Sequence, residues 1–155
     1  MKALILMAIL ALAPGLPPET AERYANDIAV AADGDFDMAA ALIATAEAES
    51  NFRSAIERCK CQQWECDRGG DGEIRALGLF QIQYYWWGNH DSDEICSDNT
   101  LAATLAAKEL SYLQKRFGWA RALRYHIGGK ATDDQVRPRL RRFEQLTREW
   151  SAGRS

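Results

Sequence analysis

Apolar residues recur at helical spacing along most of the chain, so that nearly every segment between glycine or proline positions predicts a helix. Pro17 and Pro18 mark the start of one such helix, which continues to Ala32 before Gly34 ends it. Asp37 is the expected N-cap of the next, and Asn99 or Thr100 that of a later one. The further helices are expected over residues 38–51, 100–117, 119–125 and 136–150. The pattern predicts a mainly α protein.

Two neighbouring segments lack a sustained period. Residues 53–76 contain three cysteines and several glycines, and we expect a long irregular loop there. Residues 77–87 form a dense apolar and aromatic run that suits neither helix nor strand clearly. Aromatic runs are more often core than binding surface, so we expect at least two of its last four aromatic residues to be buried. These four are Tyr84, Tyr85, Trp86 and Trp87.

Length and charge limit the function classes. A chain of 155 residues favours a single domain, which we expect to be a monomer. Its formal net charge of −3 argues against a protein built to neutralise nucleic-acid phosphates. Five arginines surround the apolar stripe of the last helix, and such runs usually form a solvated face. They are Arg137, Arg139, Arg141, Arg142 and Arg148.

The N-terminal residues have the features of an export signal. Residues 3–13 are uncharged and largely apolar, follow Lys2, and end in the small-residue pattern Ala11-Leu12-Ala13. We therefore expect residues 1–16 to be a signal peptide or apolar N-terminal segment, residues 17–155 to be the functional domain, and the protein to be periplasmic or secreted. The alternative is a buried first helix. No stretch reaches the roughly 18 apolar residues needed to cross a bilayer, so stable membrane insertion is not expected.

The cysteines form an even set of four: Cys59, Cys61, Cys66 and Cys96. In an exported chain this indicates two disulfides. Cys59 and Cys61 are too close in sequence to pair easily with each other, so that one or the other of them is expected to pair with Cys96. The alternative is a zinc site with four thiolate ligands, but the C-x-C-x4-C spacing lacks the paired C-x2-C hooks of such sites. We expect no metal and no cofactor.

Two carboxylates lie near the end of the helix over 38–51, and helical geometry separates them. At about 100° per residue, Glu49 falls within roughly 20° of Met38 and Leu42 on the apolar stripe, whereas Glu47 points toward solvent. Burial and the negative end of the helix dipole both favour a protonated Glu49, the form that a general acid needs. The alternative is a structural Glu hydrogen-bonded to a nearby amide.

Three motifs then follow in order: Glu49-Ser50-Asn51-Phe52, Gly78-Leu79-Phe80-Gln81-Ile82 and Tyr125-His126-Ile127-Gly128-Gly129. Together they resemble the soluble lytic transglycosylase domain family, which has a lysozyme-like fold akin to goose-type lysozymes. The resemblance covers residues from about 41 to 129. His126 departs from it, because the family usually has Asn there, and the separation of the first two motifs is longer than usual.

The resemblance implies a mainly α, lysozyme-like fold with the disulfide-stapled loop between the catalytic helix and the sugar cleft. It implies cleavage of the β-1,4 bond between N-acetylmuramic acid and N-acetylglucosamine in peptidoglycan, with 1,6-anhydro products. Glu49 would be the catalytic acid and base, and the substrate-binding residues would be Ser50, Gln81 and Tyr125. Peptidoglycan glycan strands would be the partner.

Three other functions stay open. The loop acids Glu65, Asp67, Asp71 and Glu73 could supply a second carboxylate and make the enzyme a hydrolytic lysozyme. The protein could instead be a catalytically silent peptidoglycan-binding module, or a zinc-stapled interaction domain.

Overall fold

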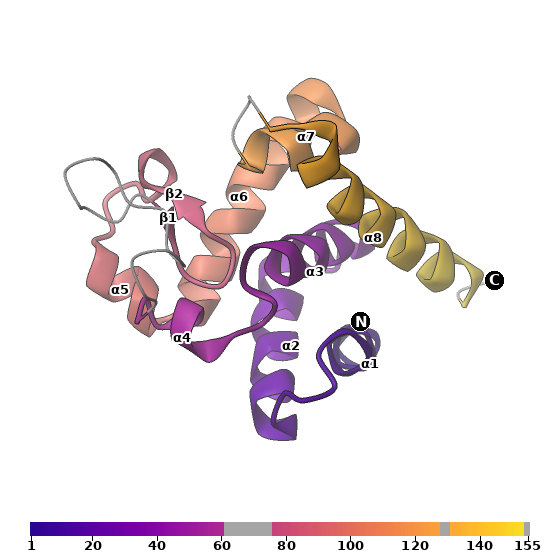
Figure 1. The fold of residues 1–155 in the computed structure, drawn as a ribbon, viewed down its shortest axis with the longest axis horizontal. Coiled ribbons are helices and arrows are strands. Elements are labelled where there is room, and N and C mark those ends of the chain that lie inside the picture. The colour runs from indigo at the N-terminus through magenta and orange to yellow at the C-terminus, as the bar shows by residue number, and fades with distance from the viewer. Residues whose placement is uncertain (61–75, 128–130, 154–155) are drawn as a thin grey trace.

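The computed structural model describes residues 1–60, 76–127 and 131–153, and the described chain is mainly helical (Figure 1). The helices are α1 (Lys2–Leu12), α2 (Pro18–Ala32), α3 (Phe36–Ser50), α4 (Ser54–Glu57), α5 (Ser92–Ser97), α6 (Asn99–Phe117), α7 (Trp119–Ile127) and α8 (Asp133–Ala152). Two short strands, β1 (Ala76–Leu77) and β2 (Ile82–Gln83), and the 3₁₀ turn η1 (Tyr84–Trp86) complete the set. The prediction of a mainly α protein is confirmed.

Helices α3 and α6 begin one or two residues earlier than the sequence suggested. Asp35, not Asp37, is the N-cap of α3, because its carboxylate accepts hydrogen bonds from the backbone N–H groups of Asp37 and Met38. Asp98, not Asn99 or Thr100, is the N-cap of α6, and it accepts from the N–H of Leu101. Both Asp side chains reach the free amides of the first turn, which an Asp inside that turn cannot do.

Helix α3 lies at the centre of the packing and contacts α1, α2, α6 and α8. It runs antiparallel to α8, since Phe36 at its start contacts the Trp150 ring near the end of α8 and Glu49 at its end contacts Arg139 near the start of α8. Residues 38–46 of α3 are all buried. The end of α3 that carries Glu49 is therefore fixed from several sides.

Helix α1 belongs to the same packed body. Ile5 and Ile9 are fully buried, and α1 packs against α2 and α3 (Figure 1). This is the geometry of the alternative, a buried first helix; export and cleavage of the segment stay predictions. Among the helices of the described residues, none combines the length and apolar character required to cross a membrane.

The apolar run after residue 75 folds as a tight antiparallel strand pair followed by a 3₁₀ turn. Leu77 pairs with Ile82 and Ala76 with Gln83. The expectation that at least two of the four aromatic residues are buried is wrong. Tyr84 and Tyr85 are 55% and 59% exposed, and Trp86 and Trp87 are only partly buried. The core here is filled instead by Leu77, Leu79, Phe80 and Ile82.

Two buried carboxylates connect α2 to the elements around the site. The Glu57 carboxylate at the end of α4 accepts a 2.8 Å hydrogen bond from the Tyr24 hydroxyl and pairs with Arg23. Asp27 accepts from the Asn99 amide and the Thr100 hydroxyl at the start of α6, both at 2.7 Å. Glu57 is thus compensated by the Arg23 charge, and both oxygens of Asp27 accept hydrogen bonds from neutral donors, so that both buried carboxylates are hydrogen-bonded.

One disulfide lies in the described residues and joins Cys59, just after α4, to Cys96 in α5, with 5.6 Å between their Cα atoms. Of the two expected partners of Cys96, the structure thus shows Cys59 and not Cys61. A four-thiolate zinc site is excluded, because two of its ligands are oxidised. Cys61 and Cys66, for which we expect the second disulfide, lie outside the described residues.

We predict that replacing both Cys59 and Cys96 by Ala lowers the free energy of unfolding by about 3–4 kcal/mol. The loop-closure model gives this value for a bridge across a sequence separation of 37. Urea unfolding at neutral pH, with wild type as reference, measures the change. A double variant as stable as wild type would contradict the pairing.

Candidate functional site

Glu49 lies in the last turn of α3 with its carboxylate directed at α8. Its Oε1 is 2.5 Å from Nη2 of Arg139, and the Glu49 side chain is 18% exposed while that of Arg139 is only 6% exposed. The Nε and Nη1 of Arg139 have no hydrogen-bond partner among the described residues. Glu49 is thus the contact that compensates the buried guanidinium, and its carboxylate is held at the boundary between core and solvent.

The backbone turns sharply just after Glu49. Asn51 and Phe52 have φ values of 48° and 57°, in the left-handed region that non-glycine residues rarely adopt. The buried Ser50 hydroxyl supports this turn, donating to the Ala46 carbonyl at 2.7 Å and accepting from the Phe52 N–H at 3.2 Å. Ser50 was expected to contact the substrate. In the structure its hydroxyl fixes the helix end that holds Glu49.

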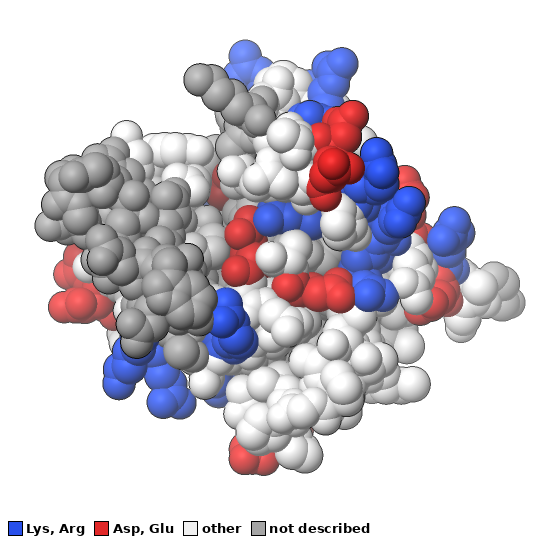
Figure 2. Space-filling model, viewed as in Figure 1, with Lys and Arg blue, Asp and Glu red and all other residues white. Residues whose placement is uncertain are grey.

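Glu47 was expected to point into solvent, but it lies partly buried against α8. Its carboxylate receives two hydrogen bonds from Arg142 of α8, at 2.7 and 2.9 Å, and its side chain is 25% exposed. The pairing raises the pKa of Arg142, chiefly through the hydrogen bond to Glu47. A pocket of about 360 Å³ lies at this seam, lined by Glu47, Arg139 and Arg142 among others. Figure 2 shows the acidic and basic side chains meeting over α3 and α8.

Gln81 lies in the tight turn between β1 and β2, also in the left-handed region, with φ 49°. Its backbone N–H and its Nε2 both donate to the Gly78 carbonyl, at 3.1 and 3.0 Å. Gly78 itself has φ 71° and faces the Ala102 side chain of α6 at 3.6 Å from its would-be Cβ. The Gly-Leu-Phe-Gln-Ile sequence thus builds a turn that presses against α6.

His126 of α7 is completely buried, and both of its ring nitrogens face acceptors. Nε2 donates to the Phe80 carbonyl at 2.8 Å, and Nδ1 lies 3.1 Å from Oε2 of Glu109, a residue of α6 that is 1% exposed. Burial by itself lowers the pKa of His126, but the Glu109 carboxylate outweighs this, with a smaller contribution from Glu49, so that the pKa is raised above 6.5. His126, at the position where the resemblance leads one to expect Asn, thus forms a buried ion pair with Glu109.

His126 connects the second and third motifs of the sequence. Phe80, whose carbonyl His126 binds, precedes Gln81, and Tyr125 directly precedes His126. Glu49 is close enough for its charge to act on the imidazole. Tyr125 is 38% exposed, with its ring centroid 4.8 Å from that of Phe117. His126 thus joins α7 to the β1–β2 turn and to α6.

Sequence reasoning missed two residues of this site. Arg139 was expected on a solvated face, yet it is buried because it shares the helical stripe of Val136, Phe143 and Trp150. The spacing of three and four residues along this stripe was the available signal. Glu109 carries the same signal, because it lies four residues from each of the buried residues Leu105 and Leu113 of α6.

No family model matches the chain, and no curated protein or solved structure matches it either. Within the part of the chain that the structure describes, no group of three or more His, Cys, Asp or Glu residues could hold a metal ion. The side chains of the site are therefore the basis for any proposal about its chemistry.

We predict that the stabilisation contributed by the His126–Glu109 pair decreases as the pH rises. Because the folded pKa of His126 is raised above its unfolded value of about 6.5, the pair contributes its full stabilisation below that pH. The contribution is lost as the pH rises through the folded pKa. The difference in unfolding free energy between wild type and His126→Asn, measured by urea titration from pH 6 to 9, should shrink as the pH rises. A difference that is constant or grows would mean that His126 is not charged in the fold.

Proposed function

We propose that the protein is a peptidoglycan lytic transglycosylase that cleaves the β-1,4 bond between N-acetylmuramic acid and N-acetylglucosamine. The observation that carries the proposal is the position of Glu49. It is a carboxylate at the edge of the core, placed by Arg139 and the Ser50 turn. The disulfide and the N-terminal segment favour a periplasmic or secreted location.

The first step requires a proton on Glu49, which interrupts its charge pairing with Arg139. Glu49 donates this proton to the glycosidic oxygen, and the bond from C1 of the muramyl sugar to that oxygen breaks. The N-acetyl group of the same sugar stabilises the positive charge that develops at C1. The N-acetylglucosamine side leaves with a free hydroxyl. Glu49 is then a carboxylate, and the adjacent Arg139 guanidinium stabilises its negative charge.

In the second step the C6 hydroxyl of the muramyl sugar attacks C1 and gives its proton to Glu49. This forms the 1,6-anhydro ring and restores the protonated acid, and no water is consumed. A single carboxylate serves both steps, in contrast to the two carboxylates of most glycosidases. Gln81 and Tyr125 would line the glycan cleft.

A hydrolytic lysozyme of the same fold is the principal alternative, because the loop acids that could act as a second carboxylate lie outside the described residues. These are Glu65, Asp67, Asp71 and Glu73. A silent peptidoglycan-binding module is the other alternative. Loss of turnover on removal of the Glu49 carboxyl would exclude the silent module.

We predict that Glu49→Gln lowers turnover of peptidoglycan by about 10⁴-fold or more. General acid–base catalysis contributes about 10²–10⁴ in rate, and here one residue serves both steps. Loss of turbidity of a sacculus suspension measures the rate. Gln keeps the shape of the side chain, and circular dichroism confirms that the variant is folded.

Glu47→Gln is the matched control. Glu47 lies on the same helix and also pairs with an arginine of α8, in a more exposed pair than Glu49–Arg139, so that its substitution removes an α3–α8 ion pair without touching the proposed acid. We expect its turnover to stay within about threefold of wild type, because a partly exposed pair contributes little. Equal losses in the two variants would show that the effect of Glu49→Gln is structural.

A further inference from the structure

Two clusters of aromatic side chains, bridged by Arg116, extend over the surface from η1 over α6 to α7. We call them together the aromatic track; it consists of Tyr84, Tyr85, Trp86, Tyr112, Phe117 and Tyr125. Ring centroids are 5.4 Å apart from Tyr84 to Tyr85, 6.3 Å from Tyr85 to Trp86 and 5.4 Å from Trp86 to Tyr112. Arg116 lies over both the Tyr112 and Phe117 rings, and Phe117 contacts Tyr125. The track thus consists of two clusters, Tyr84–Tyr85–Trp86–Tyr112 and Phe117–Tyr125, which Arg116 bridges.

The track is exposed although its residues are large. Tyr84, Tyr85 and Tyr112 are 55%, 59% and 48% exposed, and Phe117 and Tyr125 are 36% and 38% exposed. Trp86 is partly buried and packs against the core, which attaches the track to the fold. Rings that contact one another but leave about half of their surface in solvent contribute little to the core, and such contiguous exposure indicates a binding surface.

We propose that the aromatic track binds a β-1,4-linked N-acetylhexosamine strand and extends the cleft beyond the site of cleavage. The proposal rests on the proposed function for its ligand. Pyranose rings have apolar C–H faces edged with hydroxyl and amide groups, and tyrosine offers a matching flat apolar face with a hydroxyl at its rim. Four of the six members of the track are tyrosines.

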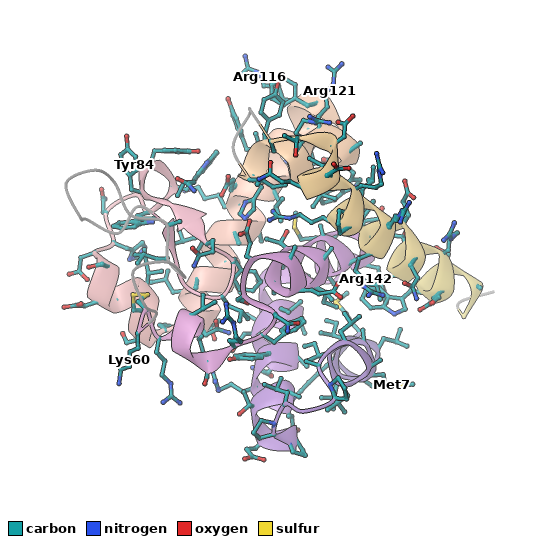
Figure 3. All side chains as sticks on the ribbon, in the orientation of Figure 1. Met7, Lys60, Tyr84, Arg116, Arg121 and Arg142 are labelled. Atoms are coloured by element: carbon teal, nitrogen blue, oxygen red, sulfur yellow. A yellow bond between two sulfur atoms is a disulfide. The ribbon has the colours of Figure 1, made fainter. Side chains whose placement is uncertain are left out.

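Position and charge favour this ligand. The track begins at Tyr84, directly after the strand β2 that follows Gln81, and includes Tyr125, so that it contains one proposed glycan-binding residue and closely follows another in sequence. Arg116 lies within it, hydrogen-bonded to the Tyr112 hydroxyl at 2.6 Å. Its guanidinium suits the carboxylates of the stem peptides that peptidoglycan strands carry. Figure 3 shows Tyr84 and Arg116 projecting outward from the molecule.

The composition of the track also argues against a lipid or purely apolar partner. The large exposed aliphatic side chains of the described residues are not in the track but on α1 and α2, and they are Met7, Leu10 and Val30. Met7 projects from α1 on another side of the molecule (Figure 3). It provides a control for nonspecific adhesion through exposed apolar groups.

The test measures binding in the full-length Glu49→Gln protein, so that the strand is not cleaved. The probes are purified sacculi, by co-sedimentation, and a soluble N-acetylglucosamine hexamer, by calorimetry. Tyr84→Ala/Tyr85→Ala should bind both probes at least about tenfold more weakly, since two ring contacts are lost. Tyr84→Phe/Tyr85→Phe should bind within about twofold of the parent, because the faces are kept. Met7→Ala should bind as the parent does.

Unchanged binding in Tyr84→Ala/Tyr85→Ala would overturn the proposal and leave the track as a surface for another class of partner. An equal loss in Met7→Ala would also overturn it, because binding would then be nonspecific adhesion. These binding results are read separately from turnover, which tests the proposed function. If Glu49→Gln leaves turnover unchanged, the catalytic assignment fails whether or not the track binds the hexamer.

Discussion

The ion pair between Glu49 and Arg139 is the interaction on which the proposed chemistry depends. Arg139 is almost completely buried and has no other described partner for Nε and Nη1, so that Glu49 alone compensates its charge. Removing one partner of such a pair costs about 3–5 kcal/mol, because the other charge is left uncompensated. The pair therefore ties the end of α3 to α8 and fixes the carboxylate at the rim of the core. A carboxylate held in this way is preorganised for proton transfer.

A second buried ion pair orders the other side of the site. His126 and Glu109 join α7 to α6, and the hydrogen bond from His126 to the Phe80 carbonyl adds the β1–β2 turn. Both pairs place charges where hydrophobic side chains would fill space at lower cost. The interior thus gives up some stability near the site while the core around α3, rich in alanine, stays apolar. This distribution is expected where local stability is exchanged for a fixed arrangement of charges.

Most of the helical architecture could be predicted from the sequence, because it depends on local signals. The spacing of apolar residues and the glycine and proline positions gave α2, α3, α6, α7 and α8 to within a few residues. Helix starts were displaced because two Asp residues, Asp35 and Asp98, compete for the role of N-cap with neighbours of similar propensity. The pairing partner of Cys96 was narrowed to two cysteines, but the choice between them depends on the path of the chain after α4.

The arrangement of the site was less predictable, because it depends on contacts between distant residues. Glu49 could be placed by helical phase, yet its partner Arg139 is 90 positions away and was assigned to solvent. Glu47 was placed in solvent by the same reasoning, although Arg142 holds it at the α3–α8 seam. The aromatic run after β2 looked like core by composition. It is exposed because the residues just before it already fill the space beneath.

The central claim is that Glu49 acts alone, as acid and then as base, without a water nucleophile. Digestion of purified peptidoglycan in oxygen-18 water, followed by mass spectrometry of the products, tests this most directly. The single-carboxylate mechanism predicts muramyl products one water lighter than hydrolysed ends, with no label from the solvent. Products with reducing ends that carry one labelled oxygen at C1 would contradict it, because they require a water nucleophile.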